Sequence, residues 1–172
     1  MKRSEELAPL SREHLTALIL VYCLKHGRSS NPRYPWPEDP LRQGAKALQM
    51  WQDELHWHFE AEEQFLFAPF EAQLSPELQR ISQELLNEHT QIRKLILGLA
   101  NQSETETVRA LMQLGILLEA HIKKEEKVYF AGLESELPEA ARVQAGQAIL
   151  DFYAQREPFV CIFTGEKRTL RF

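Results

Sequence analysis

The sequence predicts an all-α fold: an antiparallel up-down four-helix bundle with an extra C-terminal helix and tail. Glycine is scarce, at 7 of 172 residues, while Glu, Leu, Ala and Gln are abundant, and this composition favours helix over sheet. Apolar residues recur at helical spacing along four segments that are joined mostly by short breaks. One domain should therefore span residues 1–172, with the bundle at about 8–133 and the C-terminal helix and tail at 134–172.

The first helix is expected between Ser11, whose hydroxyl can cap its N-terminus, and Gly27, which can end it. Four prolines and a glycine between residues 27 and 40 exclude a helix there, so this segment should be a loop. The apolar stripe predicted for the first helix consists of Leu15, Leu18, Ile19 and Tyr22.

The second and third helices each carry a start signal, which is a capping residue followed by proline at the first helical position. Asp39-Pro40 opens a helix that should reach about residue 72, with Pro69 bending or trimming its end. Ser75-Pro76 opens the next helix, which should reach about residue 100.

The fourth helix is expected to follow a short turn at residues 101–103 and to run toward Phe130. Gly132 is predicted to stop it. A fifth, shorter helix should begin at residues 135–138 and end before Pro158. The tail at 159–172 mixes apolar and basic residues, and its pattern predicts no regular element.

Charge and composition exclude several classes of partner. A net charge of -5 argues against nucleic acid, whose readers usually carry a basic face. No apolar run approaches the roughly 20 residues that a membrane span needs, and the N-terminus lacks the pattern of a signal peptide. Cys23 and Cys161 form no Cys-x-x-Cys motif, so free thiols and a cytoplasmic location are expected. Helical bundles commonly dimerise, which makes a second copy a possible partner.

Polar residues interrupt the apolar stripes in a regular way. Two helices carry His-x-x-x-Glu at heptad positions that belong to the core, and this spacing puts both side chains on one face, one turn apart. Two further helices carry a single inward-facing histidine. The six predicted metal ligands are His14, His58, Glu62, His89, His121 and Glu125.

A cation explains this set better than hydrogen bonds alone. A single inward histidine is usually a hydrogen-bonded core residue, and a single His-x-x-x-Glu is usually a surface pair. Burying two carboxylates without a compensating charge would, however, cost several kcal/mol for each. Nitrogen and oxygen ligands without thiolate suit iron, with manganese or zinc as alternatives. A metal-free interaction module is the competing interpretation.

The remaining polar residues are interpreted without a metal. His26, at the end of the first helix, is a favourable cation there, and His56 lies on another face than His58. Glu63 and Glu126 each follow a predicted ligand, and a step of about 100° turns them toward solvent. The same heptad rows place Phe65 and Val128 in the core.

The ordered set His, His-x-x-x-Glu, His, His-x-x-x-Glu resembles the hemerythrin-like family, the hemerythrin HHE cation-binding domain. The matching segments are Ser11–His14, His58–Glu63, Glu88–His89 and His121–Glu126. The resemblance implies an antiparallel four-helix bundle with a non-haem di-iron centre. It also implies that His14 and His121 lie toward one iron, that His58 and His89 lie toward the other, and that Glu62 and Glu125 bridge the two.

The sequence departs from oxygen-carrying hemerythrins on the third helix. Those proteins have a further histidine four residues along, where this chain has Arg93 in one direction from His89 and Leu85 in the other. Fewer ligands leave more open coordination positions, which admit oxygen, nitric oxide or peroxide. The resemblance therefore favours binding or sensing of oxygen or nitric oxide, or iron handling, over reversible oxygen carriage. A di-iron oxidase or peroxidase is the alternative, although no electron-donor site or catalytic residue is evident.

Overall fold

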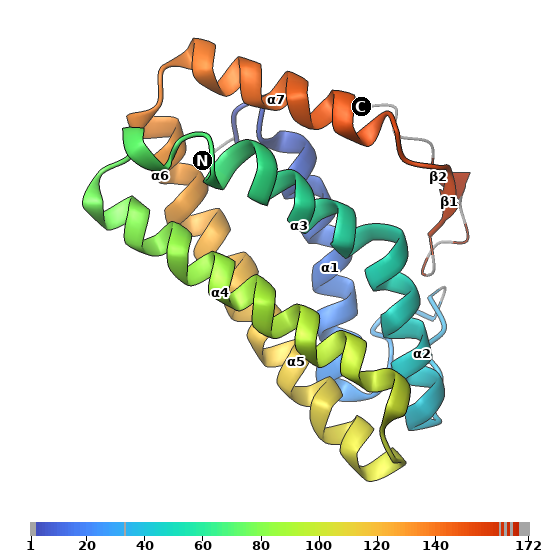
Figure 1. Cartoon of the computed structure of the whole chain (residues 1–172). Coiled ribbons are helices and arrows are strands. Elements are labelled where there is room, and N and C mark those ends of the chain that lie inside the picture. The colour runs from blue at the N-terminus through green and yellow to red at the C-terminus, as the bar shows by residue number, and fades with distance from the viewer. Residues whose placement is uncertain (1–2, 33, 162, 164, 166, 169–172) are drawn as a thin grey trace.

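The computed structural model describes residues 3–32, 34–161, 163, 165, 167 and 168, and it is mostly helical, as predicted (Figure 1). Strands β1 (Phe159–Val160) and β2 (Lys167–Arg168) pair antiparallel near the C-terminus. No helix in the described part of the chain is long and apolar enough to cross a membrane. The helices are α1 Ala8–His26, α2 Pro40–Met50, α3 His56–Glu62, α4 Pro76–Gly98, α5 Glu104–Lys124, α6 Phe130–Glu136 and α7 Glu139–Tyr153.

The predicted start signals of the second and third helices are confirmed as caps. The Asp39 carboxylate accepts a hydrogen bond from the backbone N–H of Arg42 at 2.8 Å, at the start of α2. Ser75 caps α4 in the same way, because its hydroxyl accepts from the backbone N–H of Leu78. Each cap satisfies a backbone donor that has no partner within its helix.

The start predicted for the first helix is wrong, whereas its predicted end is confirmed. The helix begins at Ala8, with Pro9 in its first turn, and Ser11 lies inside it. The Ser11 hydroxyl donates a hydrogen bond to the Glu126 carboxylate at 2.6 Å instead of capping the helix. Gly27 ends α1 with a φ of 62°, a conformation that glycine adopts without steric cost.

Three π-helical turns, at Trp51–Leu55, Glu63–Phe67 and Glu125–Tyr129, lie within the long helices. A π-helical turn inserts one extra residue and rotates everything that follows relative to the heptad pattern. Leu66 and Tyr129 are therefore buried where Phe65 and Val128 were predicted, and Val128 is 41% exposed. The second predicted helix also ends at Phe67 rather than near residue 72.

Gly132 does not stop a helix, because α6 continues to Glu136. A Cβ atom at this position would lie 2.4 Å from Cδ1 of Leu78, a buried side chain of α4. The glycine therefore allows α6 to approach α4 closely.

The predicted stripe of α1 is also partly wrong. Leu15 is 64% exposed and Leu18 is 37% exposed, while Leu10, Ala17 and Val21 are buried. The helix is apolar on more than one face, so periodicity alone could not decide which face packs against α5.

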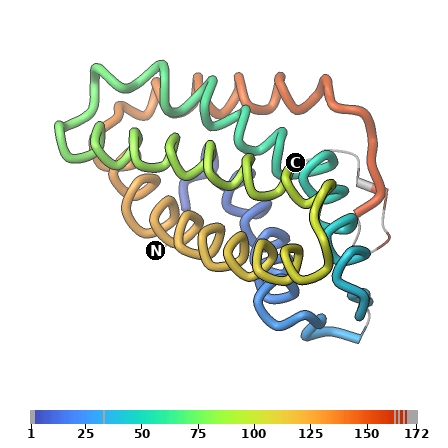
Figure 2. Tube along the Cα trace, turned by 60° about the horizontal axis from the view of Figure 1, so that its bottom comes forward, coloured from blue at the N-terminus to red at the C-terminus, as the bar shows by residue number. Residues whose placement is uncertain are grey.

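Two apolar clusters lie on either side of a polar layer. On α4, Leu85 belongs to one cluster and Ile92 to the other, with His89 between them along the helix. On α1, His14 lies between Leu10 and Ala17 in the same way. Helices α4 and α5 run side by side along much of their length (Figure 2). The helices thus carry the polar side chains to one level inside a closed apolar core.

We expect Gly115→Val to destabilise the fold, because α1 and α5 approach closely at this glycine. A Cβ at position 115 would lie 2.8 Å from Cγ of Lys25 and 3.1 Å from Cβ of Leu24. Overpacking of this kind costs about 1–3 kcal/mol, measurable by urea denaturation. The control is Gly98→Ala, whose Cβ meets only an ordinary contact at 3.6 Å, so stability should hold or rise. If both variants lost the same free energy of unfolding, the close approach of α1 to α5 at Gly115 would be contradicted.

Candidate metal centre

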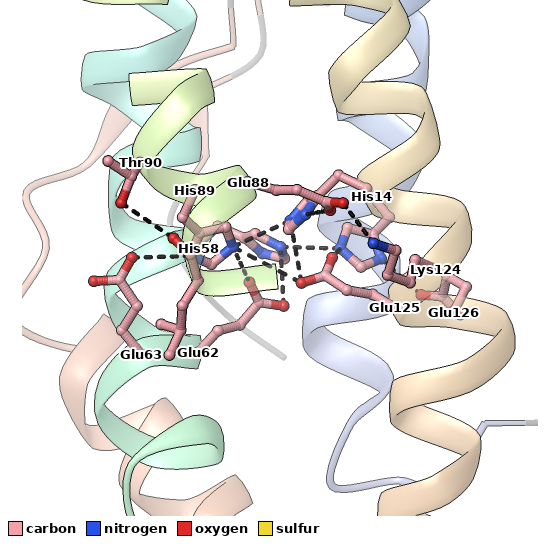
Figure 3. Close-up of polar contacts among 12 residues, drawn as sticks. His14, His58, Glu62, Glu63, Glu88, His89, Thr90, Lys124, Glu125 and Glu126 are labelled. Atoms are coloured by element: carbon pink, nitrogen blue, oxygen red, sulfur yellow. Dashed lines mark hydrogen bonds and ion pairs between the residues drawn. The ribbon is translucent and has the colours of Figure 1, made fainter. Parts of the chain in front are cut away.

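The structure brings the six predicted ligands together in its interior. All are buried, and the two carboxylates are fully inaccessible to solvent. Figure 3 shows how five of them lie together: His14, His58, Glu62, His89 and Glu125. They come from α1, from α3, from α4 and from the end of α5 with its following π-helical turn. Two π-helical turns begin at, or directly after, the carboxylates Glu125 and Glu62, and irregular turns of this kind often mark functional sites.

The ligand atoms form two groups, each of which could hold a metal ion. His14 and His58 belong to one group and His89 and His121 to the other, while both groups share Glu62 and Glu125. Within the pairs the Nε2 atoms lie 3.0 Å and 3.1 Å apart. The pairing that the resemblance implied, His14 with His121 and His58 with His89, is therefore wrong. Sequence order does not reveal it, because it depends on which helices are neighbours.

Each carboxylate offers one oxygen to each histidine pair. The two oxygens of Glu125 lie 3.1 Å from His14 Nε2 and 3.2 Å from His121 Nε2. The oxygens of Glu62 lie 3.3 Å from His58 Nε2 and 3.4 Å from His89 Nε2. Both carboxylates thus have the placement that a bridge between two metal positions requires.

A second set of carboxylates supports the histidines from outside. The Nδ1 atom of every histidine in the site lies within 3.0 Å of a glutamate oxygen on a neighbouring helix, so the Nδ1–H donates to it. Such partners orient the imidazole and fix Nε2 as the inward-facing atom. The pairs are Glu126 with His14, Glu13 with His58, Glu63 with His89 and Glu88 with His121.

Glu63 and Glu126 are therefore not simply solvated, as the sequence suggested. Each outer glutamate directly precedes or follows a predicted ligand, as in Glu13-His14 and Glu62-Glu63. This adjacency is the signal that sequence reasoning missed. The step of about 100° turns the glutamate away from the ligand beside it and toward a histidine of the next helix.

The outer carboxylates are in turn held by further donors. Lys124 contacts Glu88 at 2.5 Å, and Arg93 contacts Glu63 at 3.1 Å. Glu126 accepts from the Arg3 guanidinium at 2.8 Å, and Glu13 accepts from the Tyr153 hydroxyl at 2.6 Å.

The inward-facing atoms are all hydrogen-bond acceptors when the histidines are neutral. None of the four oxygens of Glu62 and Glu125 accepts a hydrogen bond from the described residues. The histidines already donate through Nδ1, which leaves a lone pair on each Nε2. Acceptors that converge away from water require a cation, so the residues present fit a metal centre.

In the metal-free protein, protons on the histidines supply the positive charge that the buried carboxylates require. Burial disfavours the charged form of His14, but the adjacent carboxylates of Glu125 and Glu126 outweigh burial and raise its pKa to about 10. The same balance raises the pKa of His89 to about 10. Burial likewise disfavours the ionised form of Glu125, yet the charge of His121 holds the pKa of Glu125 well below its usual range. A metal must therefore displace protons as it binds.

Open space borders the site on the side of His14 and His58. A cavity of about 10 Å³ lies against both rings, with Glu13 and Glu54 also in its wall. A surface groove of about 570 Å³ reaches His14 from outside.

The residues that the sequence set aside stay outside both groups. Arg93 is partly exposed, Leu85 is fully buried in an apolar cluster, and neither replaces a ligand. His26 is exposed at the end of α1, and His56 is partly exposed beside Glu60.

Comparison with known protein families agrees with the fit of these residues to a metal centre. The family model for the hemerythrin HHE cation binding domain matches residues 10–133, well over half of the chain. No curated protein and no solved structure matches the chain. The matched segment contains all six predicted ligands, whereas α7 and the paired strands lie beyond it. This chain belongs to the hemerythrin HHE cation-binding domain family.

Proposed function

We propose that this protein holds a non-haem di-iron centre and uses it to bind or sense oxygen or nitric oxide, or to handle iron. One observation carries the proposal: four histidine nitrogens and two carboxylates converge in a buried site, and none of the four carboxylate oxygens accepts a hydrogen bond from the described residues. Glu62 and Glu125 would bridge two metals, and each metal would take two histidines. We also propose that the four helices that carry these residues form an antiparallel bundle.

The donor set supports iron. Imidazole nitrogen and carboxylate oxygen without thiolate suit iron or manganese, and they are also compatible with zinc. The free cysteines Cys23 and Cys161 are not members of either ligand group. Iron held at these positions would supply a change of oxidation state and open coordination positions for small molecules.

The number of histidines supports sensing or iron handling over oxygen carriage. Each ligand group contains two histidines and two shared carboxylates, and no third histidine joins either group within the described residues. Coordination positions would therefore stay open at both metals. Turnover as an oxidase or peroxidase would need an electron donor, so steady-state consumption of oxygen or peroxide distinguishes an enzyme from a sensor.

The test is elemental analysis of the purified protein, combined with its absorption spectrum in air and after reduction. We expect close to two irons per chain and a near-ultraviolet absorption that bleaches on reduction. Two manganese or zinc ions would replace iron in the proposal while leaving the site intact. A protein that contains no metal and takes up none on anaerobic addition of Fe(II) would refute the proposal and leave a polar-cored helical module.

A further inference from the structure

The four outer carboxylates are not held alike. Arg93 on α4 and Lys124 on α5 hold the two that support His89 and His121, and both belong to the segment that the family model matches. The two that support His14 and His58 also have partners outside that segment, although Ser11, which lies within it, donates to Glu126 as well. Arg3 contacts Glu126 from the N-terminal side, and Glu13 is contacted by the last residue of α7 and by an arginine just beyond it.

Tyr153 is the residue of α7 that reaches the site. Its side chain is fully buried, and its hydroxyl donates to Oε2 of Glu13 at 2.6 Å. The same oxygen accepts from Nδ1 of His58 at 3.0 Å. Arg156, just beyond α7, places its guanidinium 3.7 Å from the other oxygen of Glu13. A continuous chain of polar contacts thus joins α7 to a single ligand.

The docking of α7 depends on the helix that carries His58. The Phe152 ring packs 5.1 Å from the ring of Trp57 and 5.6 Å from that of Phe65. Ile149 of α7 is fully buried in the apolar cluster that also contains Leu66. Figures 1 and 2 show α7 lying along α3 and the segment that follows it, away from most of α5.

This placement has an energetic consequence. A hydrogen bond from a buried hydroxyl to a carboxylate is stronger than one between neutral groups, and it fixes which way the carboxylate points. If α7 moved away, Glu13 would lose the Tyr153 hydroxyl and the nearby charge of Arg156. His58 would then lose part of its orientation, while His89 and His121 would keep Glu63 and Glu88 in place.

We propose that Tyr153 is a positioning residue that couples the C-terminal helix to one half of the metal centre. The metal between His14 and His58 is retained only while α7 is docked, whereas the metal between His89 and His121 does not depend on α7. Coupling of this kind is reciprocal, so loss of the first metal loosens α7. The inference rests on the proposed function, because it requires two bound metals.

The experiment is metal release from the Fe(II)-loaded full-length protein, mixed anaerobically with excess ferrous chelator. We expect Tyr153→Phe to accelerate one of two release phases by less than the about 10–100-fold that is typical of removing a direct outer partner of a metal ligand, because Tyr153 contacts that partner, Glu13, and not the ligand. Glu13→Gln should accelerate the same phase. Lys124→Gln, the matched change on the other side, should accelerate the other phase.

Tyr22→Phe is the control, because the Tyr22 ring packs 4.3 Å from the ring of His26 at the C-terminal end of α1, and the change should alter neither phase. A purely structural role for Tyr153 would lower the melting temperature and accelerate both phases alike, which would overturn the inference. So would an unchanged release pattern, or Tyr153→Phe and Lys124→Gln acting on the same phase. Wild-type protein that takes up no iron would instead refute the proposed function, so the two failures are distinguishable.

Discussion

Glu62→Ala should reduce the metal content from about two ions per chain to nearly none. The two Glu62 oxygens lie beside His58 Nε2 and His89 Nε2, so one substitution removes a ligand from both positions. Loss of an outer partner alone costs about 10–100-fold in metal affinity, so loss of a shared ligand should exceed ~100-fold. Glu125→Ala should have the same effect, because its oxygens lie beside His14 and His121.

Metal analysis after dialysis against a weak chelator measures this effect. Glu62→Gln is the isosteric companion: it keeps the side-chain volume but removes the charge and turns an NH2 group toward one histidine pair. His56→Ala is the control, because His56 is partly exposed beside Glu60 and belongs to neither group. A His56→Ala protein that loses its metal, beside a Glu62→Ala protein that keeps two, would disprove the ligand assignment.

Loading with metal should raise the melting temperature by roughly 8–16 °C. A ligand at 1,000 times its Kd stabilises the folded state by about 4.1 kcal/mol for one site. For a chain of this size, each kcal/mol corresponds to about 2–4 °C. Metal binding also displaces the protons that His14 and His89 carry in the metal-free folded protein.

This stabilisation should grow as the pH rises from 6.5 to 8.5. In the metal-free protein the pKa values of His14 and His89 are raised to about 10, whereas the unfolded chain has values near 6.5. The stability that these histidines contribute is therefore complete below about pH 6.5 and is lost progressively as the pH rises toward 10. The metal-loaded protein carries no such protons, so its stability should change little over this range.

Differential scanning calorimetry of the metal-free and Fe(II)-loaded protein under anaerobic conditions checks both expectations. The free energy of unfolding of the Fe(II)-loaded protein should exceed that of the metal-free protein by an amount that grows with pH. The increase should be up to ~1.4 kcal/mol per pH unit for each of the two histidines. Glu62→Ala serves as the control and should show no shift on addition of Fe(II). If this difference in unfolding free energy instead became smaller as the pH rises, the histidines would be neutral in the metal-free protein.

The sequence by itself determined the helical class of the fold and which histidines and glutamates face inward. Asp39-Pro40 and Ser75-Pro76 mark helix starts through local hydrogen bonds, and the structure confirms both. The spacing in His-x-x-x-Glu places the side chains on one face because the helical period is local and constant. The same ordered residues carry the family resemblance, and the family match over residues 10–133 confirms it.

Only the tertiary structure decided how these residues meet. Sequence periodicity says which face of a helix is buried, but it does not say which helix that face meets, nor at what rotation. The pairing of His14 with His58, and of Glu126 with His14, depends on those neighbours. The π-helical turn that buries Tyr129 instead of Val128 begins at Glu125, and the heptad pattern of the sequence does not reveal it. The contact between Tyr153 and Glu13 joins residues 140 positions apart, and no local pattern predicts an interaction at that separation.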